Sequence, residues 1–199
     1  GSAEVAILIN QPPTGVTLVA ISPSDPVTSD PLQASVTEAA IDPDGDPITY
    51  TYSWYVDDVM AGISGDTVPA QETSQGQVWR VEALPTDPYA AGEIGEASVT
   101  IGNTPPSLEG VSLLPSAGNT DTTFTCGLSG GSDDDGDTES VQYAWLVNGD
   151  VVPGATDATL TGEFFVKGDA VQCTVTPVDG QGAGAPVTSE IAPILDTAP

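Results

Sequence analysis

Short runs of alternating apolar and polar residues follow one another along the chain, separated by Gly, Pro, Asp and Ser. No stretch of ten or more residues keeps a helical period. Alternation between turn-forming residues is typical of half-buried strands. The pattern therefore predicts an all-β protein, with strands at residues 15–21, 32–37, 48–56, 77–83 and 98–101, and again at 107–113, 122–128, 140–147, 158–160, 170–176 and 187–194.

The alternation also assigns side chains to faces. Tyr52 and Trp54 share one face of their strand, and Tyr143 and Trp145 share the matching face of theirs. A spacing of two places such residues on the buried side of a strand. We therefore interpret these aromatic residues as core, in preference to a sugar-stacking platform. Trp79 has the same spacing and is expected in the core as well.

The chain contains one pattern twice. DPDGDPITYTYSW at residues 42–54 returns as DDDGDTESVQYAW at 133–145, and Pro85 and Asp87 return as Pro177 and Asp179. A repeat of about 90 residues is long enough to bury its own core. The sequence therefore predicts two copies of one domain, at residues 10–102 and 103–196.

The two ends of the chain resemble the junction between the repeats. Residues 3–13 and 189–199 read like 96–106, an alternating apolar stretch followed by a Pro-containing linker. We interpret residues 3–9 as the last strand of a preceding repeat, and 197–199 as the start of the next linker. The alternative is that residues 3–9 form an edge strand of the first domain. Gly1-Ser2 is set aside as a remnant of cloning.

The net charge is −27, from 29 acidic against 2 basic residues. Such a surface repels phosphate backbones and anionic lipid headgroups, which excludes nucleic acid and membrane surfaces as partners. No apolar run reaches the length of a membrane span, so direct membrane insertion is not expected. The charge suits divalent cations, or high salt that screens self-repulsion.

Both cysteines lie in the second repeat. Cys126 and Cys173 align with Ala34 and Val81 in the first repeat. Joint replacement by small apolar residues indicates an optional disulfide across the core, whereas a metal site would need more ligands. Two buried free thiols are the alternative. A disulfide would place the protein in an oxidising, extracytoplasmic setting.

Each repeat carries three aspartates at positions i, i+2 and i+4, with Gly at i+3. They are Asp42, Asp44 and Asp46, and Asp133, Asp135 and Asp137. Alternate carboxylates on a turning loop can converge on one Ca²⁺, and the Gly permits the sharp turn. No Glu follows at the twelfth position, which rules out an EF-hand. A solvated acidic turn is the alternative, because Asp and Gly favour turns in any case.

These landmarks resemble those of a known group of domains. The linker N-T-P-P, the DxDGD cluster, Y-x-W, V-x-C-x-V-T-P and a following D-G look like tandem immunoglobulin-like repeats of prokaryotic cell-surface or adhesin-type proteins, related to PKD and cadherin-like modules. The resemblance implies two tandem Ig-like β-sandwiches. It also implies that the loops after the second and sixth strands meet the incoming linker, which brings Asp87 and Asp179 toward the two clusters as further calcium ligands.

The linker at residues 102–106 is short, and Pro105-Pro106 favours an extended chain. We therefore expect the two domains to be arranged end to end. The partners expected are neighbouring repeats of the same chain, and other cell-surface proteins or glycans. The fragment itself is expected to be a monomer in an extracellular or cell-surface location.

Little in the sequence supports catalysis. The chain has no His, which excludes His-based triads and His metal sites. The sequence predicts a non-enzymatic spacer or stalk of a large surface protein, stiffened by Ca²⁺. The alternative is a carbohydrate- or protein-binding accessory module.

Overall fold

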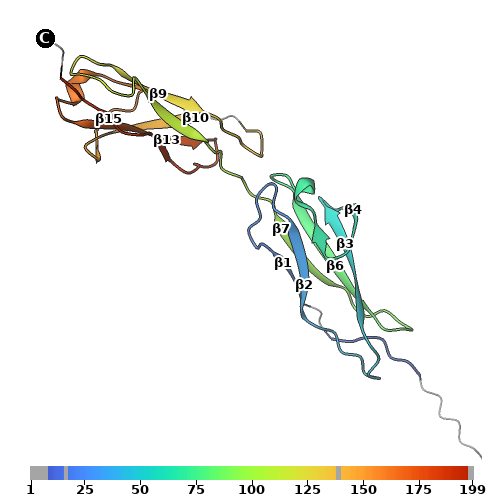
Figure 1. The fold of residues 1–199 in the computed structure, drawn as a ribbon. Helices are drawn as coiled ribbons and strands as arrows, with labels where there is room; N and C mark the ends of the chain where they lie inside the picture. The colour runs from blue at the N-terminus through green and yellow to red at the C-terminus, as the bar shows by residue number, and fades with distance from the viewer. Residues whose placement is uncertain (1–8, 16–17, 138–139, 197–199) are drawn as a thin grey trace, which may run out of the picture. The chain divides into compact units, whose positions relative to one another are not determined.

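A computed structural model describes residues 9–15, 18–137 and 140–196. These residues form β-strands and two short 3₁₀ helices, with no α-helix among them. The chain divides into two compact units, residues 1–103 (unit 1) and 104–199 (unit 2), which are blue to green and green to red in Figure 1. The expected all-β fold is confirmed. The predicted strand at 3–9, except Ile9, and the linker start at 197–199 lie outside the described residues.

Unit 1 is a sandwich of two antiparallel sheets. The three-stranded sheet has the order β1-β2-β5, and the four-stranded sheet has the order β4-β3-β6-β7. Their bounds are β1 (Leu18–Ser22), β2 (Leu32–Glu38), β3 (Thr49–Val56), β4 (Val59–Ser64), β5 (Thr67–Val68), β6 (Val78–Thr86) and β7 (Gly95–Thr100), with η1 (Ala70–Glu72) after β5. A sheet of β1, β2 and β5 thus packs against a sheet of β3, β4, β6 and β7, which is the arrangement of an immunoglobulin-like sandwich.

Two tryptophans fill the core of unit 1. Trp54 on β3 is fully buried, and Trp79 on β6 meets it edge to face, with ring centroids 6.3 Å apart. Such a pair adds to the stabilisation that burial alone provides. The Trp54 Nε1 donates to the carbonyl of Gly65 at 3.0 Å, so the polar end of the indole is satisfied. The faces predicted from the alternation are confirmed.

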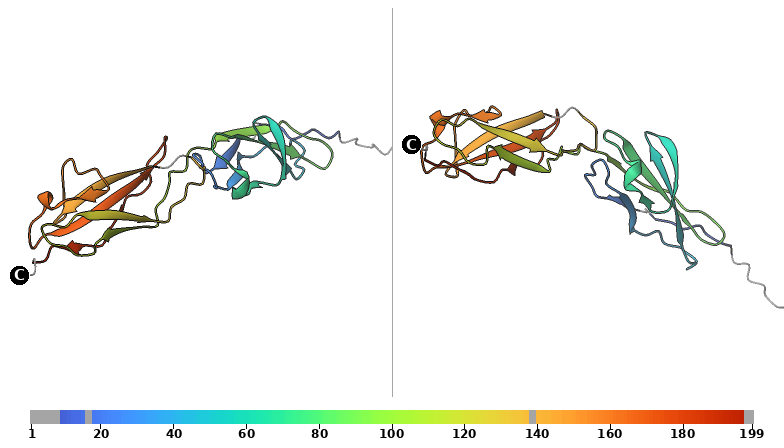
Figure 2. Two further views of the ribbon diagram at one scale, coloured as in Figure 1. Left: turned by 90° about the horizontal axis from the view of Figure 1, so that it is seen from above. Right: turned by 45° about the horizontal axis from the view of Figure 1, so that its top comes forward.

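Unit 2 repeats this design. Its sheets have the orders β12-β9-β8 and β11-β10-β13-β14, with β15 pairing β13 as well. Figure 2 shows the strands of each unit in two layers. The bounds are β8 (Gly110–Leu114), β9 (Phe124–Ser129), β10 (Ser140–Val147), β11 (Asp150–Val151), β12 (Thr159–Leu160), β13 (Ala170–Val178), β14 (Val187–Thr188) and β15 (Ala192–Pro193), with η2 (Gly162–Phe164) after β12.

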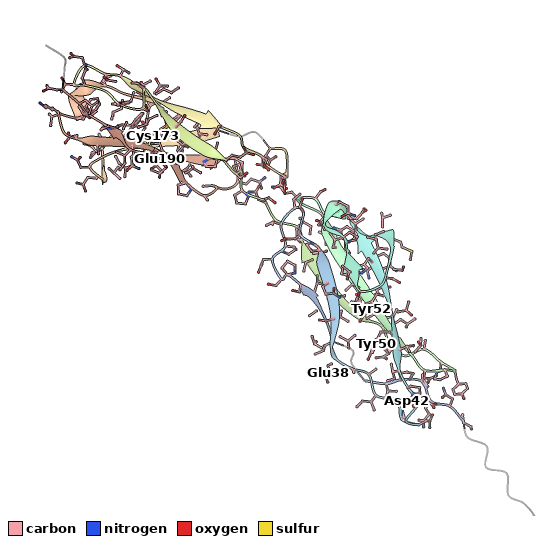
Figure 3. The ribbon with its side chains drawn as sticks, in the orientation of Figure 1. Glu38, Asp42, Tyr50, Tyr52, Cys173 and Glu190 are labelled. Atoms are coloured by element: carbon pink, nitrogen blue, oxygen red, sulfur yellow. A yellow bond between two sulfur atoms is a disulfide. The ribbon has the colours of Figure 1, made fainter. Side chains whose placement is uncertain are left out.

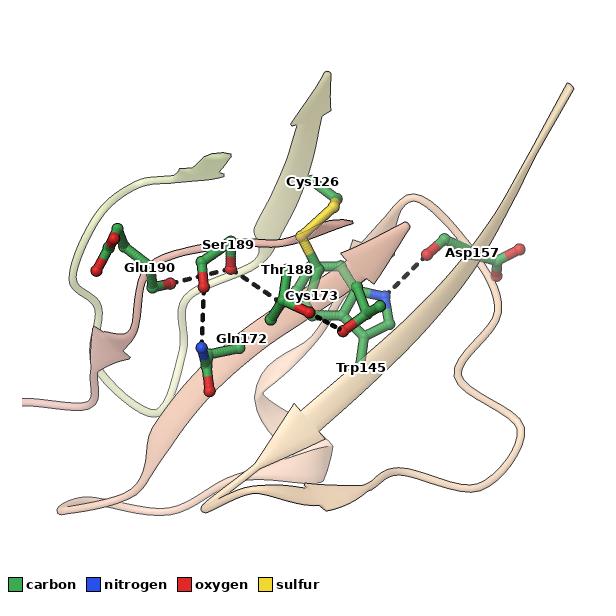
Figure 4. The surroundings of a disulfide bond; sticks show 9 residues. Cys126, Trp145, Asp157, Gln172, Cys173, Thr188, Ser189 and Glu190 are labelled. Carbon is green, nitrogen blue, oxygen red and sulfur yellow. Dashed lines mark hydrogen bonds between the residues drawn. A yellow bond between two sulfur atoms is a disulfide. The ribbon is translucent and has the colours of Figure 1, made fainter. Parts of the chain in front are cut away.

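A disulfide crosses the core of unit 2. Cys126 on β9 and Cys173 on β13 are bonded, with Cα atoms 6.2 Å apart, which confirms the predicted bridge. Figure 4 shows the bridge beside Trp145, which pairs with Cys173 across the sheet. Trp54 pairs with Val81 in the same register in unit 1. One unit thus links its two sheets covalently where the other packs Ala34 and Val81 in an apolar core.

Three of the strands do not appear among those predicted from the sequence, and one predicted strand is interrupted. The missed strands β4, β5 and β11 lie at or next to sheet edges, where alternation is weak because few side chains are buried. The predicted strand 187–194 is split into β14 and β15. Between them Ser189 turns its hydroxyl inward to accept a hydrogen bond from the Cys173 amide at 3.1 Å (Figure 4). Among the described residues no helix has the length and apolar character to cross a membrane.

Candidate cation-binding loops

The first acidic cluster lies in the loop between β2 and β3. Asp42 is only 9% exposed, and its Oδ1 accepts hydrogen bonds from the amides of Asp44 at 2.9 Å and Asp46 at 3.0 Å. Gly45, at φ +83°, lets the chain turn back so that its amide reaches the Asp42 carbonyl at 3.2 Å. The loop therefore folds around the Asp42 side chain, which is labelled in Figure 3.

A second acidic loop follows β6 in the same unit. Asp87 is 8% exposed, and its Oδ1 accepts from the amides of Tyr89 and Ala90, both at 2.6 Å. The side-chain amide of Asn10 donates to Asp87 Oδ2 at 3.2 Å, although the two residues are 77 positions apart. The backbone of Gln11 donates to Asp44 Oδ2 at 2.7 Å. The incoming chain thus touches both acidic loops.

Two oxygens in this group have no hydrogen-bond partner. They are Asp42 Oδ2 and Asn10 Oδ1, both buried at the atom level. A buried acceptor without a partner is costly and calls for an explanation such as an ion or an ordered water. A cavity of about 450 Å³ opens beside Asn10 and is also lined by Ile9, Asp44, Asp46 and Tyr89.

The electrostatics of unit 1 reflect crowded negative charge. Burial raises the pKa of Asp46, and the neighbouring carboxylates Asp42, Asp87 and Asp44 raise it further. For Asp87, burial also acts to raise the pKa, but hydrogen bonds from the Tyr89, Ala90 and Asn10 amides outweigh it and hold the pKa below its usual range. Hydrogen-bond donors therefore stabilise the ionised form of Asp87, whereas neighbouring carboxylates destabilise the ionised form of Asp46.

Unit 2 repeats the same loops. The Asp135 amide donates to Asp133 Oδ1 at 2.8 Å, and the Thr104 amide donates to Asp135 Oδ2 at 2.6 Å, as Gln11 does to Asp44. Asp179 Oδ1 accepts from the amides of Gln181 and Gly182. Asp133 Oδ2 and Asp135 Oδ1 have no hydrogen-bond partner. The repeated sequence thus folds into a repeated geometry, including the unpartnered oxygen of its first aspartate.

One contact of the unit 2 loop has no counterpart in unit 1. Gln181 Nε2 donates to Asp137 Oδ2 at 3.1 Å and so engages the third aspartate of the unit 2 cluster. Unit 1 has Tyr89 in the corresponding position, and that residue is 76% exposed. No pattern in the sequence predicts this contact, because the side chain of a glutamine two residues after Asp179 can point in any direction.

The described parts of the chain contain no ready-made metal centre of three or more acidic or cysteine side chains. In Asp42 and Asp87, one carboxylate oxygen accepts hydrogen bonds from backbone amides, so fewer carboxylate oxygens are available to coordinate an ion. An ion at either loop would therefore need backbone carbonyls or water in addition to the aspartates. Whether Ca²⁺ binds the eight predicted residues stays a prediction.

The two basic side chains lie away from the acidic loops. Arg80 on the outer face of β6 stacks 4.2 Å over the Tyr55 ring and pairs with Glu82 and, at 3.5 Å, with Glu96. The hydrogen bond from Arg80 holds the pKa of Glu82 below its usual range, against the opposing effect of burial. In unit 2, Lys167 pairs with Asp196 at 2.6 Å on the surface.

Aromatic side chains are mostly withdrawn from solvent. All three tryptophans are buried. Tyr50 and Tyr52, which Figure 3 labels on β3, are half-buried. Tyr50 anchors its hydroxyl on the Ala40 amide at 2.9 Å. The described residues thus present no exposed pair of aromatic rings on one sheet face, which is what a sugar-stacking platform requires.

No family model matches the chain, and no curated protein does. Among solved structures, the chain is similar to a two-domain fibronectin type III segment of chicken tenascin, with 12% identity over 91% of this chain and 98% of that one, at a TM-score of 0.45. Three N-terminal domains of the outer capsid protein Hoc of bacteriophage RB49 are 14% identical over 92% of this chain and 71% of that one, at 0.44. Fibronectin(III)-like modules of Clostridium thermocellum CbhA are 15% identical, cover 89% and 94%, and score 0.31. Likeness at this level says nothing of ligand or activity, and the fold assignment rests on the sheet order given above.

Proposed function

We propose that the chain is a non-enzymatic spacer segment of a larger extracellular protein. One observation carries the proposal: each unit closes its own hydrophobic core, one around Trp54 and Trp79 and the other around Trp145 and the disulfide. A module with a complete core can be repeated along a chain without needing its neighbours. Its buried aromatic side chains support a structural role over a sugar-binding one.

The cell-surface location has two supports. The Cys126–Cys173 disulfide suits an oxidising compartment. A net charge of −27 keeps such chains soluble and apart from one another, as neighbouring stalks at a surface require. A cadherin- or PKD-like affiliation would fit both features.

Small-angle scattering of the intact chain tests the spacer proposal. The short linker leads us to expect an extended particle with a maximum dimension near twice that of one unit. Adding a third copy of the repeat should lengthen it by a similar step. A compact particle, with a dimension close to that of a single unit, would refute the spacer and favour a binding cleft.

Calcium belongs to the proposal as a stiffener of the acidic loops. Asp42 and Asp133 each have one carboxylate oxygen, Oδ2, without a hydrogen-bond partner. The other oxygen of each, Oδ1, accepts a hydrogen bond from a backbone amide. An ion at these oxygens would remove the cost of leaving them unmet and would tie the loops together. Affinities in the range of about 10⁻⁴ to 10⁻³ M are typical of extracellular calcium modules.

Thermal melts with millimolar CaCl₂ against EDTA test the calcium component. A ligand that binds only the native state raises the melting temperature. The double substitution Asp135→Asn with Asp137→Asn should remove the shift from unit 2. If NaCl at matched ionic strength gives the same shift as CaCl₂, screening explains it and the loops are acidic turns.

One observation favours the alternative of a binding module. On the outer face of the four-stranded sheet of unit 1, an open cavity of about 360 Å³ is lined by Asp57, Asp58, Val78, Arg80 and Ser98. It combines the chain's one arginine with carboxylates and an apolar side chain. Arg80→Ala should abolish binding to a glycan panel if this face holds a ligand. A panel that detects no binding by the wild-type chain would remove the alternative.

A further inference from the structure

We propose that the two acidic loops are unequal, and that the unit 1 loop binds Ca²⁺ more tightly and fills first. This inference rests on the calcium component of the proposed function and deepens it. It assigns the Asn10 side-chain oxygen as a ligand in unit 1. In unit 2 it assigns to Gln181 the role of competing with the ion for Asp137 Oδ2.

The first difference is the burial of the leading aspartate. Asp42 is 9% exposed and its Oδ2 has no partner, whereas Asp133 in unit 2 is only partly buried. Water can therefore reach the Asp133 side chain more readily than the Asp42 side chain, although the Oδ2 atom of each has no hydrogen-bond partner. A cation compensates a charge more strongly where water is excluded, because the effective dielectric is lower.

The second difference is the amide oxygen of Asn10. The Asn10 Nδ2 donates to Asp87 Oδ2 at 3.2 Å, and Oδ1 is left buried and unpartnered. The reverse orientation would set the amide oxygen against the carboxylate oxygen, so the contact fixes which way the amide points. Side-chain amide oxygens are ordinary Ca²⁺ ligands. Asp87 therefore holds Asn10 with its oxygen available to an ion.

The third difference is the glutamine at the unit 2 loop. Gln181 Nε2 already donates to Asp137 Oδ2, which partly satisfies this carboxylate without an ion. A cation that takes the same oxygen must break the hydrogen bond. In unit 1 the side chain of Tyr89 is exposed, so no amide side chain stands at this position. These differences favour unit 1, and together they outweigh the second buried oxygen without a partner in the unit 2 cluster, Asp135 Oδ1.

A site-resolved titration tests the inequality. Gly45 and Gly136 hold the same position in the two loops, and their backbone amides serve as reporters in ¹⁵N NMR spectra of the intact chain. Calcium chloride is added to metal-free protein at constant ionic strength. We expect the Gly45 signal to reach its midpoint at a Ca²⁺ concentration several-fold lower than the Gly136 signal.

Three variants separate the causes. Asn10→Ala should raise the Gly45 midpoint by at least about tenfold, because even the groups that only support a metal's ligands typically cost that much when they are removed. Asn10→Asp keeps an oxygen at this place and should recover binding. Gln181→Ala should lower the Gly136 midpoint and leave Gly45 unchanged, because the backbone of Gln181 keeps its bond to Asp179.

The possible outcomes distinguish this inference from the calcium proposal itself. Equal midpoints, or Gly136 titrating first, would overturn the inequality while calcium binding stands. An unchanged Gly45 midpoint in Asn10→Ala, with the other signals of unit 1 retained, would overturn the ligand assignment. If neither glycine responds to Ca²⁺, or if NaCl reproduces the response, calcium binding and this inference are both overturned.

Discussion

Replacing the disulfide of unit 2 by the residues that unit 1 uses offers a direct measurement of its contribution. The change is Cys126→Ala with Cys173→Val, which copies Ala34 and Val81. The bridge joins residues with a sequence separation of 47. On the chain-entropy model, closing a loop of this size destabilises the unfolded state by about 4 kcal/mol. Both replacements are apolar and stand in a buried core, so the loss should come mainly from the released loop.

Hydrogen exchange read by mass spectrometry gives the result for each unit separately. Where exchange requires unfolding of a whole unit, a loss of about 4 kcal/mol lowers the protection of β9 and β13 by nearly three powers of ten. Peptides from β2 and β6 serve as the internal control, because unit 1 is unchanged. Reduction of the wild-type chain should reproduce the effect.

Two results would refute this reasoning. If protection in β13 falls by less than tenfold, the bridge contributes little beyond the core around it, and the entropy estimate fails. If β6 loses protection together with β13, the units do not unfold independently, and the self-contained cores cannot be the basis of a spacer.

The other predictions concern single residues. Trp79→Ala should destabilise unit 1 by about 3–5 kcal/mol, the usual cost of emptying a buried tryptophan site, as measured by urea denaturation. Gly184→Ala should destabilise unit 2, because a Cβ there would overlap a backbone carbonyl, whereas Gly180→Ala should be neutral, having open space around it. Glu82→Gln should lower the unfolding free energy at pH 7, because its folded pKa lies below the unfolded value. That difference between variant and wild type is fully present above the unfolded pKa of about 4.3 and disappears as the pH falls through the folded pKa, and denaturant titrations from pH 7 to pH 3 check it.

Much of the fold could be read from the sequence because buried strands alternate clearly. The strands that carry Trp54 and Trp145 bury one face, and their period is plain in the letters. Strand β4 was missed because its apolar residues Val59 and Met60 are exposed, which removes the contrast between faces. Strand β11 could have been predicted, because Asn148-Gly149 is a dipeptide that favours two-residue turns between paired strands.

The candidate site was predictable only in outline. The doubled aspartate pattern located the loops, and the sandwich topology explained why Asp87 and Asp179 lie in the loops that follow β6 and β13. The contact of Asn10 with Asp87 spans 77 residues and depends on how the incoming chain crosses the loops. Local pattern cannot report such a contact. The contact of Gln181 with Asp137 escaped for the same reason.

The placement of the two basic residues has a consequence for proteolysis. Enzymes that cleave after Lys or Arg find two target bonds in this chain of 199 residues. The bond after Arg80 lies inside β6, which is paired on both sides by β3 and β7 and would have to leave the sheet to enter a protease cleft. The bond after Lys167 lies in a surface turn where Gly168 is at φ +92°. A trypsin-like enzyme therefore has one accessible place to cut the folded chain, and the Cys126–Cys173 bridge would still join the two pieces covalently after that cut.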